Sequence, residues 1–217
     1  MHEYIELIPK LFVPENLIKI GGLGLLIFIV FAETGLFVGF FLPGDSLLFT
    51  AGILCSTKTL NIDIFTLMLL LNIAAIAGNL TGYFFGKRVG PKLFTRDDSL
   101  IFKKRYVFIT RTFYNKYGGK ALIMGRFLPI IRTFAPILSG VVQFDLKKFI
   151  IYTVAGSILW TSAMTLSAFY LTRLIPNLKN HLGLVVILMI VITAIPVFRT
   201  YLREKKTSKS QQNSVNS

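Results

Sequence analysis

The chain has 217 residues, of which 53% are apolar, and its mean hydropathy of +0.66 is too high for an ordinary soluble domain. Its formal net charge of +14 is gathered in loops between apolar runs, which indicates membrane topology and argues against nucleic-acid binding. A single cysteine excludes an internal disulfide.

Residues 1–19 mix charged and apolar side chains, which predicts a segment at the membrane interface. Residues 20–57 follow as two apolar pieces separated by Pro43-Gly44-Asp45. The second piece is too short to cross a bilayer, which takes about 20 residues, so we predict a re-entrant hairpin or broken helix. A helical hairpin that only packs is the alternative. Glu33 and Asp45, the only charged residues of this run, would then be costly in hydrocarbon.

Residues 61–86 are predicted to form a spanning helix, and glycine recurs every four residues from position 78 to position 90. One face of small residues predicts close packing against another helix. Asn79 and Tyr83 flank this face and are candidates to line a cavity, or to bond to neighbouring helices. Residues 87–117 form a basic amphipathic loop, which predicts a position at an anionic, cytoplasmic membrane surface.

A second hairpin is predicted over residues 118–146, with breaks at Pro129 and Pro136 and with Arg126 and Arg132 in its apolar part. Helices over 149–171 and 182–198 complete about three full transmembrane helices. Residues 205–217 are polar and are predicted to be a disordered cytoplasmic tail.

The expected architecture is an all-α integral membrane protein, residues 20–204, built from two re-entrant hairpins in an inverted repeat. Such repeats place a site near the bilayer midplane. Arg126 and Arg132 can bind a lipid phosphate in bidentate fashion, and Glu33 and Asp45 are candidates for proton coupling. On an unbroken helix these two acids would lie about 18 Å apart, one near a surface mouth and the other at the break.

Taken together, the motifs resemble those of the DedA family, also called SNARE-associated or VTT-domain proteins. The match runs over about residues 28–165. Its elements are Glu33, Pro43-Gly44-Asp45, the glycine helix 78–90, the stretch Gly125-Arg126-Phe127 to Gly140 with Arg132 and Pro136, Phe149, and Gly156 to Trp160. The resemblance implies that Glu33, Asp45, Arg126 and Arg132 are functional residues, and that the proton-motive force and lipids such as undecaprenyl phosphate are involved. Asn79 departs from the Asp that the family often has there.

We therefore expect a multi-pass protein of the bacterial cytoplasmic (inner) membrane that acts as a flippase for a phosphate-bearing lipid, undecaprenyl phosphate or a phospholipid. The 87–120 loop and the tail are expected to be cytoplasmic, and residues 173–180 external. A passive scramblase and a non-transporting assembly protein are the alternatives. No enzyme activity, metal or cofactor is expected, since no motif for a metal or nucleophile is present; a homodimer is left open.

Overall fold

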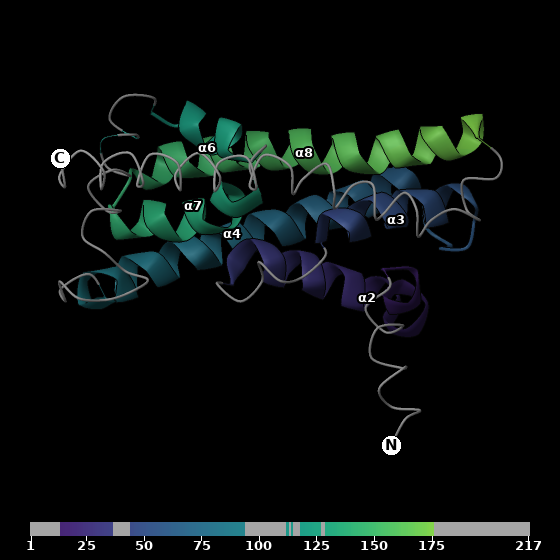
Figure 1. Cartoon of the computed structure of the whole chain (residues 1–217), viewed down its shortest axis with the longest axis horizontal. Coiled ribbons are helices and arrows are strands. Elements are labelled where there is room, and N and C mark those ends of the chain that lie inside the picture. Colours follow the sequence, from purple (N-terminus) through teal and green to yellow (C-terminus); the bar gives the residue numbers. More distant parts are fainter. Residues whose placement is uncertain are drawn as a thin grey trace, which may run out of the picture.

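The computed structural model describes residues 14–36, 44–93, 112, 114, 118–126 and 129–175 (Figure 1). This part of the chain is helical and contains no strand. Its helices are α2 (Pro14–Gly35), α3 (Gly44–Ser56), α4 (Ile64–Leu93), α6 (Lys120–Gly125), α7 (Pro129–Val141) and α8 (Leu146–Leu174).

Two helices are long and apolar enough to cross a bilayer, over Ile64–Gly90 and Leu146–Leu174. Each begins at an aspartate cap. The carboxylate of Asp63 accepts from the amides of Phe65 and Thr66, and that of Asp145 accepts from the amide of Lys148. Helices lie at both predicted positions, 61–86 and 149–171, and the Asp145 cap explains why the second starts before residue 149. That they span the membrane remains a prediction.

The short helices α3 and α7 have 13 residues each, about 20 Å at the rise of an α-helix, and are too short to span alone. Helix α2 is bent at Gly22, whose φ of 58° lies in the left-handed region that favours glycine, and its apolar part runs over Gly21–Gly35. Gly44 begins α3, after the break predicted between the two pieces of 20–57.

Tertiary packing extends one helix beyond its predicted end. Helix α4 continues to Leu93, so residues 87–93, predicted to belong to the basic loop, are helical. The reason is that Gly86 and Gly90 hold this end of α4 against α7: a Cβ at Gly86 would meet the backbone of Ile137, and one at Gly90 would meet Val141. The glycine face therefore packs closely, as predicted.

Pro136 was predicted to break the second hairpin, and this is wrong, because α7 runs through it. Pro136 has no amide hydrogen for the carbonyl of Arg132, a loss that usually disfavours a helix interior. Here Pro136 is buried against Gly82 of α4, with 3.2 Å between its Cβ and the position a Cβ would take at Gly82. Pro14 begins α2, where the first turn tolerates proline, so residues 14–19 of the predicted interfacial segment 1–19 are part of this helix.

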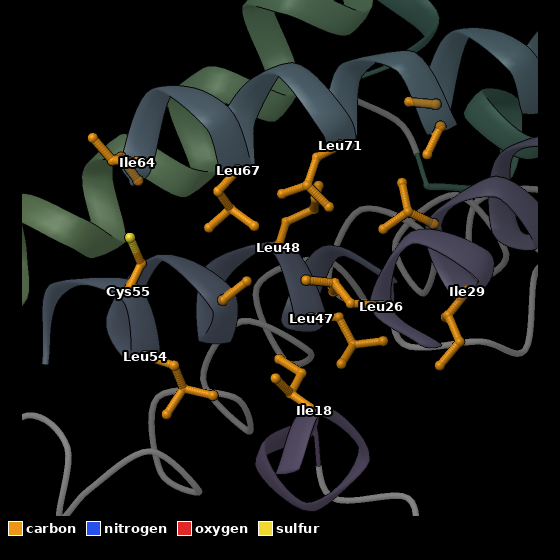
Figure 2. Packing of buried hydrophobic residues seen from close by; sticks show 14 residues of the cluster. Ile18, Leu26, Ile29, Leu47, Leu48, Leu54, Cys55, Ile64, Leu67 and Leu71 are labelled. Atoms are coloured by element: carbon orange, nitrogen blue, oxygen red, sulfur yellow. The ribbon is translucent and has the colours of Figure 1, made fainter. Parts of the chain in front are cut away.

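Helices α3 and α7 pack near opposite ends of α4. Leu47 and Leu48 of α3 share a core with Leu67 and Leu71 of α4 and Leu26 of α2 (Figure 2). Helix α7 instead packs on the stretch of α4 that carries Gly82, Gly86 and Gly90. Helix α8 packs along α3 and α4, and Figure 1 shows it running beside α3. The charged parts of α2, α3 and α7 thus meet near the middle of α4.

Several predictions lie outside the described residues: residues 1–13, Pro43, most of the basic loop, the helix 182–198 and the tail 205–217. Re-entrant insertion, the inverted repeat and the total number of spans remain predictions.

Candidate functional site

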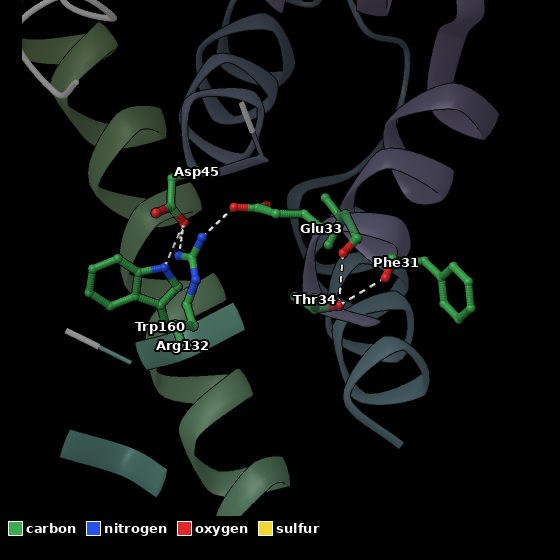
Figure 3. A network of polar contacts seen from close by, with 7 residues as sticks. Phe31, Glu33, Thr34, Asp45, Arg132 and Trp160 are labelled. Carbon is green, nitrogen blue, oxygen red and sulfur yellow. Dashed lines mark hydrogen bonds and ion pairs between the residues drawn. The ribbon is translucent and has the colours of Figure 1, made fainter. Parts of the chain in front are cut away.

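Arg132 is the centre of the buried polar cluster. Its Nη2 donates to Oε1 of Glu33 and its Nη1 to Oδ1 of Asp45, so one guanidinium contacts two carboxylates from two other helices (Figure 3). Glu33 and Arg132 are buried, at 6% and 7% exposure. The planar guanidinium fork suits this double contact, which ties α7 to α2 and α3.

Glu33 and Asp45 lie together, not 18 Å apart as an unbroken helix would require. The reason is that α2 ends at Gly35 and α3 begins at Gly44, so the chain turns between the two acids. Gly44 also makes room for the meeting, because a Cβ there would overlap the carboxylate of Glu33. The break therefore serves to bring two carboxylates to one arginine.

Trp160 of α8 is a member of the cluster that the sequence did not identify as a site residue. Its Nε1 donates to Oδ1 of Asp45 at 2.9 Å, and its ring lies 5.9 Å from Cζ of Arg132 (Figure 3). The available signal was its position as the only tryptophan of the chain, between Ser157 and Thr161, which are both buried. A buried indole usually finds an acceptor for its N–H group.

Arg126 is the second buried arginine, 7% exposed, and its surroundings are different. Its Nη2 donates to Oγ of Ser157 at 2.8 Å and to the carbonyl of Thr153 at 3.3 Å, both on α8. Gly156 lets the side chain lie close, since a Cβ there would stand 2.8 Å from Nε of Arg126. Within the described part of the chain, no carboxylate forms an ion pair with Arg126.

A small cavity of about 10 Å³ connects the two arginines, with Asn79 of α4 and Pro136 of α7 in its wall. A volume of this size is at the lower limit for one water molecule. Asn79 lies in the wall of this cavity, and its Nδ2 donates to the carbonyl of Ala75. Tyr83 is elsewhere: its hydroxyl donates to the carbonyl of Phe144 at 2.6 Å, and its ring packs on Phe149.

The two prolines predicted as breaks of the second hairpin both belong to α7. Pro129 is the first residue of α7 and lies three residues before Arg132. The preceding helix, α6, ends at Gly125. Pro136 lies inside α7. The structure thus brings together Glu33, Asp45 and Arg132, and it places Arg126 on the other side of a small cavity.

Charge is distributed unevenly over this site. Both carboxylates contact Arg132, whereas the bonds of Arg126 to α8 go to a hydroxyl and a carbonyl, which are neutral. With all groups ionised, the four charges sum to zero, but among the described residues they are not fully paired: the cluster around Arg132 has one excess negative charge, and Arg126 contacts no carboxylate. A charge without a direct ion pair is unfavourable in a buried, low-dielectric place, so each part can accept a further partner: a proton for the carboxylates and an anion for Arg126.

Comparison with known proteins points to one group of membrane proteins. The family model for the VTT domain matches residues 42–171. Protein DedA of Escherichia coli is 39% identical over 184 residues, which is 85% of this chain and 84% of that protein. The inner membrane protein YghB of E. coli is 30% identical over 152 residues, 70% of this chain and 68% of YghB. The inner membrane protein YqjA is 28% identical over 188 residues, 85% of this chain and 84% of YqjA. No solved structure matches.

Proposed function

The chain belongs to the DedA family of VTT-domain membrane proteins, and from the chemistry of its buried site we propose that it translocates a phosphate-bearing lipid across the bilayer. Undecaprenyl phosphate and phospholipids both have the required chemistry, a phosphate on a hydrocarbon chain. Two relatives carry the name inner membrane protein, which supports a location in the bacterial cytoplasmic membrane.

The observation that carries the proposal is that buried Arg126 forms no ion pair with any carboxylate of the described residues. A guanidinium binds a phosphate through two parallel N–H···O bonds, and such charge-assisted bonds are stronger away from water. Arg132 is held by two carboxylates, so in this conformation Arg126 is the better-placed group for the first contact with phosphate. Arg132 would bind the phosphate only after it has released a carboxylate.

The two carboxylates support a proton-coupled cycle. One proton on Glu33 or Asp45 would remove the excess negative charge around Arg132 and leave a single ion pair. It would also weaken the attachment of α7 to α2 or α3, since each carboxylate belongs to a different helix. Proton binding and helix rearrangement are thereby linked in our proposal.

An inverted repeat is part of the same proposal. Helices α3 and α7 have the same length, and each begins after the preceding helix has ended. They pack near opposite ends of α4. Two short helices inserted from opposite sides would let the charge cluster exchange access between the two membrane surfaces.

Reconstituted transport tests the proposal. Purified full-length protein in proteoliposomes should accelerate the translocation of a fluorescent phosphatidic acid over protein-free vesicles, and should act less on the matching diacylglycerol. Arg126→Lys keeps the charge but loses the planar fork, so we expect transport to fall at least tenfold with little loss of folded protein. Wild-type protein without transport of any phosphate lipid would contradict the function.

The alternative is an assembly protein in which the charges only join the helices, and the double contact of Arg132 favours it. Folded wild-type protein that moves no lipid would favour this alternative. Transport that stays at the wild-type rate in both Arg126→Lys and Arg132→Lys would instead exclude bidentate phosphate recognition and reduce the charges to a salt-bridge lock between the helices.

A further inference from the structure

A groove runs along one face of α8 and ends at Arg126. It encloses about 350 Å³, within the range of small-molecule sites, and among the described residues of its wall Arg126 alone is charged. The α8 residues of the wall recur at spacings of three and four, which is one stripe of a helix. They are Gly156, Leu159, Trp160, Ala163, Met164 and Ser167.

The groove has the length of a lipid chain segment. From Gly156 to Ser167 is eleven residues, about 16 Å along the helix axis, or about half of a hydrocarbon core of roughly 30 Å. Its wall reaches the surface of the described structure, as Leu159 is 55% exposed and Ala163 and Ser167 are exposed. In a membrane protein, such a face is turned toward lipid.

We propose that this α8 groove seats the hydrocarbon chain of the transported lipid while its phosphate binds Arg126. This inference rests on the proposed function and adds the position of the lipid. The occupant is argued from complementarity: an apolar stripe the length of one leaflet leads to one buried cation, and a phosphate lipid has the same sequence of parts. A free phosphate would leave the apolar stripe unused, and a neutral lipid would leave Arg126 without an anion.

Trp160 connects this groove to the charge cluster. Trp160 is part of the groove wall, and its Nε1 donates to Asp45, which also contacts Arg132. A chain seated in the groove therefore touches the residue that orients one of the two carboxylates. Occupation of the groove and the state of the Arg132 ion pairs are linked through this side chain, which acts as a positioning residue.

A photoreactive phosphatidic acid with a diazirine in its acyl chain tests the groove independently of transport. We expect cross-links to the full-length protein in liposomes to map to residues 159–167. An excess of phosphatidic acid should compete and an equal amount of diacylglycerol should not; competition by inorganic phosphate alone would overturn the role of the chain.

Two alanines of α8 provide a matched pair of variants. Ala163 lies in the groove and Ala155 is exposed outside it. Ala163→Trp fills the groove and should reduce cross-linking and transport at least fivefold, while Ala155→Trp should leave both near wild type. Equal behaviour of the two variants would overturn the groove, yet it would leave the proposed function intact if wild-type protein still transports and Arg126→Lys does not.

The other occupants give different outcomes. A disulfide between a cysteine at position 163 and one within 182–198, formed in a Cys55→Ser background with no lipid cross-linking, would mean that the chain fills the groove with its own segment. A disulfide between two copies through position 163 would mean that a second copy does so. Either result would overturn the proposal.

Discussion

Single side chains at Arg132 and Arg126 show how the same residue type can have two roles. Arg132 is shared by Glu33 and Asp45, so its charge is more than compensated, and its removal would take the cation from both carboxylates and leave Asp45 with the N–H of Trp160. Arg126 bonds to neutral groups of α8, so its removal leaves no described acid unpaired. The same substitution at the two positions should therefore affect stability differently.

We predict that Arg132→Gln lowers the stability of the folded protein by about 3–5 kcal/mol, the usual cost of breaking a buried ion pair. Arg126→Gln should cost less, and Arg132→Lys should be intermediate, since an ammonium lacks the planar fork. Thermal unfolding in detergent measures this order, with the exposed Arg173→Gln as the control. An Arg132→Gln protein as stable as Arg173→Gln would mean that the ion pairs contribute nothing.

A second prediction concerns the indole N–H of Trp160. Trp160→Phe keeps an aromatic ring in the groove wall but removes the bond to Asp45, and a hydrogen bond to a charged group contributes about 1.5–3 kcal/mol. We expect lower thermal stability and slower transport, because Asp45 loses the donor that orients it. Wild-type values of both would show that the bond has no consequence.

At the scale of helices, glycines decide how closely the elements approach. The carbonyl of Tyr83 on α4 lies where a Cβ at Gly140 of α7 would be, and the backbone of Ile137 lies against Gly86 in the same way. Cross-contacts of this kind need glycine on both helices. They fix α7 on α4 and with it the position of Arg132 relative to Glu33.

Gly86→Ala should therefore destabilise the protein by more than 1 kcal/mol, because its Cβ meets the backbone of Ile137, which cannot move alone. Gly24→Ala is the matched control: a Cβ there meets nothing within 4 Å, and alanine is favoured over glycine in a helix by about 1 kcal/mol. The measurement is thermal unfolding of both variants. Equal loss of stability in the two would contradict the role of the α4–α7 contact.

The helices and the charged residues of the site could be predicted from the sequence, and their mutual contacts could not. Long apolar runs predict α4 and α8, and the isolated charges of apolar runs identify Glu33, Asp45, Arg126 and Arg132. The pairing of both acids with Arg132, and not with Arg126, depends on where α3 restarts after the break. The helical course of α7 through Pro136 depends on its packing against Gly82, which no local pattern contains.

At the scale of the whole molecule, the expected topology follows from the basic residues of the loops. We predict that the 87–120 loop and the tail after Arg199 lie in the cytoplasm and that residues 173–180 lie outside. Single cysteines at positions 100 and 177 in a Cys55→Ser background test it with a membrane-impermeant thiol reagent on intact cells. Labelling of position 100 from outside, without labelling of position 177, would invert the topology and contradict the prediction.

We propose that lipid translocation depends on the charge cluster of α2, α3 and α7. Transport under an imposed pH gradient measures this dependence most directly. In proteoliposomes, wild-type translocation of a fluorescent phosphatidic acid should rise at least threefold when a gradient is applied. Glu33→Gln and Asp45→Asn should lose that response, because a side-chain amide does not ionise at pH values where proteins remain folded. Wild-type flux that ignores the gradient, or amide variants that respond as wild type does, would contradict proton coupling through these carboxylates and favour passive scrambling.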